Sequence, residues 1–85
     1  MDILQEVKNR LVISNNFHDN MFNGYIEDVK HFMLGSGVKK SVVESEKSIG
    51  AIAKGVSDLW LEGKFSETFK QRLIQLTFEV EDVQT

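Results

Sequence analysis

The sequence predicts an all-α fold: a small single-domain bundle of about four main helices spanning residues 1–85, with an extended C-terminal tail at 77–85. Apolar residues recur at three- and four-residue steps between 49 and 60 and again between 69 and 76, which places each set on one helix face. The short segment 63–66, Gly-Lys-Phe-Ser, separates these stripes, so the two helices must pack against each other. The chain has no proline, and its 41% hydrophobic and 27% charged residues are typical of a globular domain.

A first helix is predicted to begin after Asp2, whose side chain suits the N-cap position. Its inward face carries Ile3, Val7 and Leu11, and its outward face carries Glu6, Lys8 and Arg10. Residues 14–16, Ser-Asn-Asn, end this helix and offer a cap for a second, aromatic-rich helix over about 17–33. Gly24 lies inside the second helix at a cost of about 1 kcal/mol relative to Ala. Either a neighbouring helix crosses closely there, or the helix is locally weak.

Residues 35–37, Gly-Ser-Gly, predict the end of the second helix and a loop. Residues 38–46 fit three structures: a short helical turn, an extended stretch, or a loop that places Val42 and Val43 in the core. A third long helix follows from Ser45 or Glu46 and ends near residue 62, because Gly63 favours the left-handed backbone that terminates helices. Within it, glycines and alanines at 50, 51, 53 and 55 make one side thin enough for a close helix crossing.

Trp60 lies on the apolar stripe of the third helix, where we expect it in the core; the other interpretation is an anchor for a subunit contact. Ser66 is the predicted N-cap of the last helix, and Glu67 in its first turn complements the helix dipole. After residue 76 the pattern changes to a two-residue alternation with β-branched residues, and an isolated strand of that kind needs a partner edge.

The charge of the chain is concentrated at its C-terminal end. Glu79, Glu81 and Asp82 sum to −3, which equals the formal net charge, so residues 1–78 are neutral. A neutral body lacks the cationic field that drives nucleic-acid binding, and DNA is not expected as a direct ligand of one subunit. The absence of cysteine excludes disulfides and thiolate metal sites. An acidic beginning and the lack of a long apolar run predict neither a signal peptide nor a membrane span.

Few residues of this chain suit catalysis or metal binding. His18 and His31, the two histidines, are thirteen residues apart and lack the one-turn spacing of a helical metal pair. No phosphate loop or nucleophile elbow occurs, and the lysine-containing stretch 38–54 lacks the aromatic residues that stack on bases. We therefore expect no enzyme activity, no metal and no cofactor.

Residues 50–60, GAIAKGVSDLW, followed by Lys64-Phe65-Ser66 and by LIQL at 73–76, resemble the head-tail connector (adaptor) proteins of tailed phages. In that family a helix reading roughly A-I-A-x-x-V-x-D-L-W leads through a short x-F-S corner to a closing helix with x-x-Q-L. The opening residues 1–11 are similar to the family's L-x-x-V-K-x-x-L helix. The sequence departs from the family at 27–29, where an alanine is common, and in the short joint at 62–64, where relatives often carry a longer loop.

The resemblance implies an all-α subunit of a homo-oligomeric ring, dodecamer-like in the virion, that sits below the portal protein. Such a ring extends the channel through which genomic DNA passes as cargo, and it offers a platform for a downstream stopper or tail-completion protein. The implied location is the head-tail interface of the virion, with the host cytoplasm during assembly and no membrane. The expected interaction residues lie at the corner and in the tail: Lys64, Phe65, Phe78, Glu79, Val80, Glu81, Asp82 and Val83.

Two other functions compete with this one. A small helical regulatory or DNA-binding module would use the helix-corner-helix at Phe65 and present Lys70 and Arg72 outward. Glu67 and the acidic tail oppose the approach of phosphate groups, which weakens that hypothesis. A small hydrolase is the third class, and it lacks a recognisable nucleophile and base.

Overall fold

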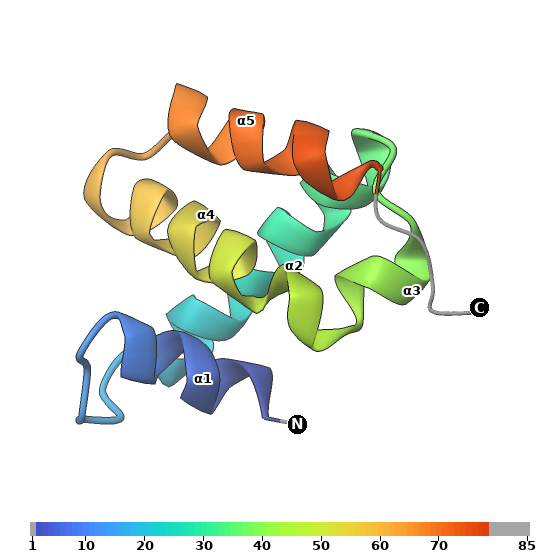
Figure 1. Ribbon diagram of the computed structural model, residues 1–85. Helices are drawn as coiled ribbons and strands as arrows, with labels where there is room; N and C mark the ends of the chain where they lie inside the picture. The colour runs from blue at the N-terminus through green and yellow to red at the C-terminus, as the bar shows by residue number, and fades with distance from the viewer. Residues whose placement is uncertain (1, 79–85) are drawn as a thin grey trace.

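The computed structural model describes residues 2–78 and is an all-α bundle, as predicted. Within these residues it contains α1 (Ile3–Arg10), α2 (Asp19–Gly35), α3 (Lys40–Val43), a 3-10 turn η1 (Glu46–Ser48), α4 (Ile49–Leu61) and α5 (Glu67–Leu76). Figure 1 shows α4 in the middle of the bundle, with α1 on one side, α5 on the other and α2 crossing behind. Helix α4 is therefore the element around which the core is built.

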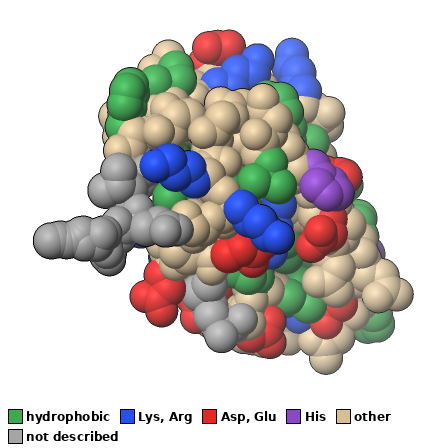
Figure 2. Space-filling view, turned by 90° about the vertical axis from the view of Figure 1, so that its right-hand side faces the viewer, with side chains coloured by type: hydrophobic (Ala, Val, Ile, Leu, Met, Phe, Trp, Pro, Cys, Tyr) green, Lys and Arg blue, Asp and Glu red, His purple; other side chains and the backbone are tan. Residues whose placement is uncertain are grey.

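The surface at the end of the bundle that carries α3 mixes acidic and basic side chains around small hydrophobic patches (Figure 2). The apolar core lies beneath it and draws on every α-helix and on the loop before α3. Its buried hydrophobic residues are Val7, Phe22, Ile26, Val29, Met33, Val38, Val42, Val43, Ala51, Ile52, Ala53, Val56, Phe69, Leu73 and Leu76.

Gly55 is the point of closest helix approach in this core. A Cβ atom on Gly55 would lie 2.7 Å from Cε1 of Phe69 and 2.9 Å from Cγ2 of Val29. The predicted thin side of α4 is thus confirmed at Gly55, where it lets both α2 and α5 pack closely against α4. A Cβ atom on Gly24 would meet no neighbouring atom within 4 Å, so the close crossing considered there is wrong.

Two predicted N-caps are confirmed. Asp2 Oδ1 accepts a hydrogen bond of 3.2 Å from the N–H of Gln5 at the start of α1. Ser66 Oγ accepts one of 3.2 Å from the N–H of Phe69 at the start of α5. Each bond satisfies a backbone donor that has no partner within its own helix.

Three of the helices are followed by a residue with left-handed backbone, at positive φ. Gly37, with φ of 99°, follows α2, and Gly63, with φ of 74°, follows α4, as the glycine pattern predicts. Helix α1 ends in the same way at Val12, whose φ of 58° is uncommon for a β-branched residue. The N–H of Val12 bonds to the carbonyl of Asn9, and the N–H of Ile13 to that of Lys8, which is the Schellman pattern of a helix end.

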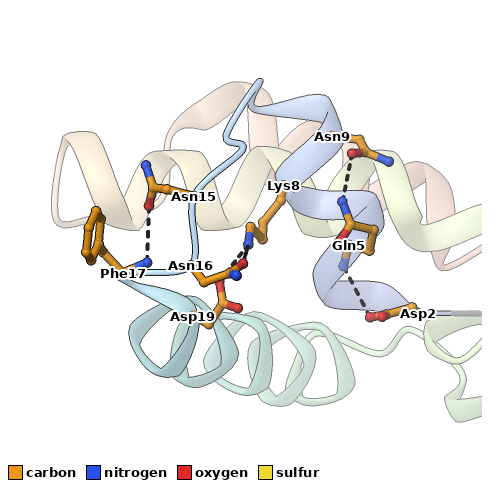
Figure 3. Close-up of polar contacts among 8 residues, drawn as sticks. All are labelled: Asp2, Gln5, Lys8, Asn9, Asn15, Asn16, Phe17 and Asp19. Atoms are coloured by element: carbon orange, nitrogen blue, oxygen red, sulfur yellow. Dashed lines mark hydrogen bonds and ion pairs between the residues drawn. The ribbon is translucent and has the colours of Figure 1, made fainter.

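Lys8 connects α1 to the start of α2, and its predicted outward position is wrong. The side chain is buried, and its Nζ donates to Oδ1 of Asp19 at 2.7 Å and to Oδ1 of Asn16 at 2.9 Å (Figure 3). Helix α2 begins at Asp19 rather than near 17, and the predicted cap from residues 14–16 is wrong: the N-cap position is His18, which makes no side-chain cap. Oδ1 of Asn15 instead accepts a hydrogen bond from the N–H of Phe17 in the preceding turn. A buried ammonium needs such partners, since leaving it unpaired carries a large desolvation cost.

Residues 38–46 combine two of the structures that the sequence allowed. Helix α3 occupies the middle of this stretch, and Val42 and Val43 are buried in the core. Ser45 then caps the 3-10 turn η1 by accepting a hydrogen bond from the N–H of Lys47, and α4 follows. The extended alternative is wrong for the middle of the stretch.

Trp60 does not lie in the core as expected. Its side chain is 39% exposed, and its indole contacts Phe22 edge to face, with ring centroids 5.1 Å apart. The residue lies in the last turn of α4, next to the end of the helix at Leu61, and its exposure shows that the neighbouring helices do not enclose it. The alternative of an exposed anchor for a subunit contact stays a prediction.

Candidate interaction surface

The corner between α4 and α5 is held by the carboxylate of Asp58. Its Oδ2 accepts a 2.7 Å hydrogen bond from Oγ of Ser66 and a 2.9 Å bond from the N–H of Ser66. Its Oδ1 pairs with Nζ of Lys54, one helical turn earlier, at 3.0 Å. Because Asp58 is buried and Ser66 caps α5, these contacts fix the direction in which α5 leaves the corner.

The Asp58 carboxylate is stabilised in its charged form. Burial alone would raise the pKa of Asp58, but the hydrogen bonds from Ser66 and the neighbouring Lys54 ammonium outweigh it and lower this pKa below the ordinary value of 3.8. Within residues 2–78, the side-chain partners of Asp58 are Ser66 and Lys54, so this carboxylate holds the junction at which α5 begins.

Phe65 leaves the corner and joins an aromatic cluster at the edge of the core. Its ring stacks on Phe69 and also contacts Phe32 of α2, with centroid distances of 4.6 Å in both pairs. Phe69 is fully buried, Phe65 is half-buried, and Phe32 is exposed. The predicted interaction residue Phe65 therefore belongs partly to the core and partly to the surface.

An apolar strip continues from this cluster along α5. Phe32 shares the lining of an open depression of about 360 Å³ with Leu73 and Ile74, and Ser36, Lys70 and Thr77 line it as well. Ile74 is 53% exposed because it lies off the stripe of Phe69 and Leu73 that faces α4. We call the exposed residues Phe32 and Ile74, together with half-buried Phe65, the α2–α5 strip. The sequence pattern did not single out Phe32 and Ile74 as surface residues, although the off-stripe position of Ile74 was a usable signal.

The other predicted interaction residues are dispersed. Lys64 is exposed at the corner, where it lines a separate depression with Leu61 and Glu62. Phe78 is 79% exposed, in a turn directly after α5, and the α-helical backbone of Thr77 shows that the tail does not become extended there. The predicted residues Glu79, Val80, Glu81, Asp82 and Val83 lie outside the described residues.

The residues expected to serve a DNA-binding module are exposed but not aligned. Lys70 pairs with Glu67 on its own helix, with Nζ and Oε2 3.7 Å apart. Arg72 instead extends over Gly50 of α4. Neighbouring Lys70 and Arg72 therefore present no joint cationic face.

Across residues 2–78, no three His, Asp or Glu side chains gather in a way that could hold a metal ion. In the same part of the chain, no helix has the length and apolar character required to cross a membrane. Comparisons of the chain with protein-family models, with curated proteins and with solved structures find no match.

Proposed function

We propose that this chain is a structural assembly subunit, a head-tail connector (adaptor) protein that forms a homo-oligomeric ring below a portal protein. The family resemblance of the helix-corner-helix motif supports the connector assignment. The observation that carries the proposal is the α2–α5 strip, because it leaves the apolar side chains of Phe32 and Ile74 exposed, outside the buried core. Contiguous exposed apolar residues are typical of surfaces that a partner covers.

The chemistry of the corner also supports a structural role. The buried carboxylate of Asp58 uses both oxygens for internal partners, so it holds a helix junction rather than offering itself to a substrate. The interspersed charges on the face in Figure 2 give no single-sign field for guiding a nucleic acid. In the proposed ring, DNA is cargo in the channel, and the portal and a stopper or tail-completion protein are the partners.

Self-association and portal binding test this function together. Purified protein should form oligomers in sedimentation and rings in negative-stain micrographs, and it should co-sediment with portal-bearing particles. Ile74→Lys should weaken association about tenfold or more, because a desolvated contact residue becomes a charge. Phe17→Lys is the matched control, since Phe17 is exposed on the α1–α2 loop, away from the strip.

The Ile74→Lys variant should keep the helical content and cooperative unfolding of the wild-type protein, because Ile74 contributes little to the core. The connector proposal would be refuted if the wild-type protein stays monomeric and fails to attach to portal particles. Salt-dependent retention on DNA under those conditions would favour the DNA-binding module instead.

A further inference from the structure

Two arginines from opposite parts of the sequence converge over Gly50, near the beginning of α4. A Cβ atom on Gly50 would lie 3.2 Å from Nη1 of Arg72 in α5 and 3.9 Å from Nη1 of Arg10 in α1. An open depression of about 370 Å³ lies on the Arg72 side of Gly50 and is lined by Gly50, Arg72 and Lys47 among others; Arg10 is not a lining residue, but its guanidinium group lies close to Gly50. The missing side chain of Gly50 leaves room for the guanidinium group of Arg72, whereas the guanidinium group of Arg10 lies at ordinary contact distance. We call Arg10, Gly50 and Arg72 the basic depression.

The two guanidinium groups lack a carboxylate partner within the described residues. The ion pairs among residues 2–78 use Lys8, Lys30, Lys54 and Lys70, and none involves either arginine. Like charges that converge without an acid repel each other, so an anion that enters between them is favoured. A guanidinium presents planar, paired N–H donors that match a carboxylate, and two of them can hold an acidic peptide segment.

The chain itself carries the complementary charge. Residues 1–78 are neutral, and the whole net charge of −3 comes from Glu79, Glu81 and Asp82. We propose that the basic depression binds this acidic segment from a second copy of the chain. This inference rests on the proposed self-assembly and names the contact that would link one subunit to the next.

The sequence of the tail favours binding to another copy over folding back. Arg72 lies one turn before the end of α5 at Leu76, so a segment that continues in the direction of α5 leads away from its own Arg72. Residues 79–85 contain no glycine, proline or asparagine that would favour a turn back, and the alternation of valine with acidic residues favours an extended backbone. Extended at about 3.3 Å per residue, residues 79–85 span roughly 20 Å, which is enough to reach a neighbouring subunit.

Complementation between two full-length variants tests this contact. The receptor variant carries Arg10→Gln and Arg72→Gln, and the tail variant carries Glu79→Gln, Glu81→Gln and Asp82→Asn. The matched control is Lys39→Gln with Lys40→Gln, which removes two exposed positive charges next to and within α3. All substituted residues with a described side chain are exposed, so each variant should keep its helical content, which circular dichroism checks.

In sedimentation equilibrium at low salt, the wild-type protein and the control should self-associate with the same affinity. The receptor and tail variants should each associate about tenfold more weakly or worse, as expected when charge-assisted hydrogen bonds are lost. An equimolar mixture of the two should form a one-to-one complex, because one variant keeps the acidic segment and the other keeps the basic depression. Added salt should dissociate that complex, because it screens the attraction between the charged groups.

Several results would overturn the inference. If either variant associates as tightly as the wild-type protein, or if the mixture forms no complex, the segment does not dock in the basic depression of another copy. A wild-type protein that stays monomeric in this experiment would also rule out this contact. Variants that associate normally and still attach to portal particles would remove this contact while leaving the proposed connector function intact, whereas failure of wild-type attachment would remove that function itself.

Discussion

Ser66→Ala is expected to destabilise the protein by more than the loss of a helix cap alone. Oγ of Ser66 accepts from the N–H of Phe69 and also donates to the buried Asp58 carboxylate at 2.7 Å. The cap contributes about 1 kcal/mol, and a hydrogen bond to a charged group contributes about 1.5–3 kcal/mol. We therefore expect the free energy of unfolding to fall by about 2.5–4 kcal/mol, measured by urea denaturation.

A double-mutant cycle with Asp58→Ala separates the two contributions of Ser66. In the Asp58→Ala background the Ser66 hydroxyl has lost its acceptor. Ser66→Ala should then lower the free energy of unfolding only by the contribution of the cap, about 1 kcal/mol. Ser66→Thr is the matched control, because threonine keeps a hydroxyl and is also a good N-cap. Equal costs of Ser66→Ala in both backgrounds would refute the reasoning, since they would show that the Ser66–Asp58 bond stabilises nothing.

The pH dependence of stability gives a second measurement on the same carboxylate. The pKa of Asp58 is lowered in the folded protein, so the unfolded chain takes up the proton first as the pH falls below the ordinary value of 3.8. The stabilisation from ionised Asp58 is present above that pH and is lost as the pH falls through the lower folded-state pKa. The stability difference between wild type and Asp58→Ala should therefore shrink below about pH 3.8. A constant difference down to about pH 2 would contradict this assignment.

Three further predictions use thermal or urea unfolding. Gly24→Ala should stabilise the protein by about 0.5–1 kcal/mol, because alanine has the higher helix propensity. Gly55→Ala should destabilise it by about 1–2 kcal/mol, because the added Cβ would collide with Phe69. If both substitutions changed the stability in the same direction, the packing at Gly55 would be contradicted. Val12→Asn should stabilise by about 0.5–1 kcal/mol, because Asn tolerates positive φ, and a less stable variant would argue against that backbone. Trp60→Ala should cost about 1–3 kcal/mol, below the loss of about 3–5 kcal/mol for a fully buried aromatic, and a larger loss would restore Trp60 to the core.

The sequence by itself determined the fold class and the ends of most helices. Asp2 and Ser66 cap helices, and Gly37 and Gly63 end them, because each of these effects depends on a residue's own backbone and a few neighbours. The corner at Phe65 was predictable for the same reason. Val12 is the exception, since a β-branched residue carries no signal for a left-handed helix end.

Only the tertiary structure decided which faces and charges meet. Gly24 and Gly55 look alike in the sequence, yet only Gly55 lies where two other helices converge. The burial of Lys8, the exposure of Trp60 and the α2–α5 strip likewise depend on where neighbouring helices begin and stop. Arg10 and Arg72 are far apart in the chain, and the packing of α1 and α5 against α4 brings them together over Gly50. Local periodicity specifies which face of a helix is apolar, whereas the crossing of helices specifies which part of that face is covered.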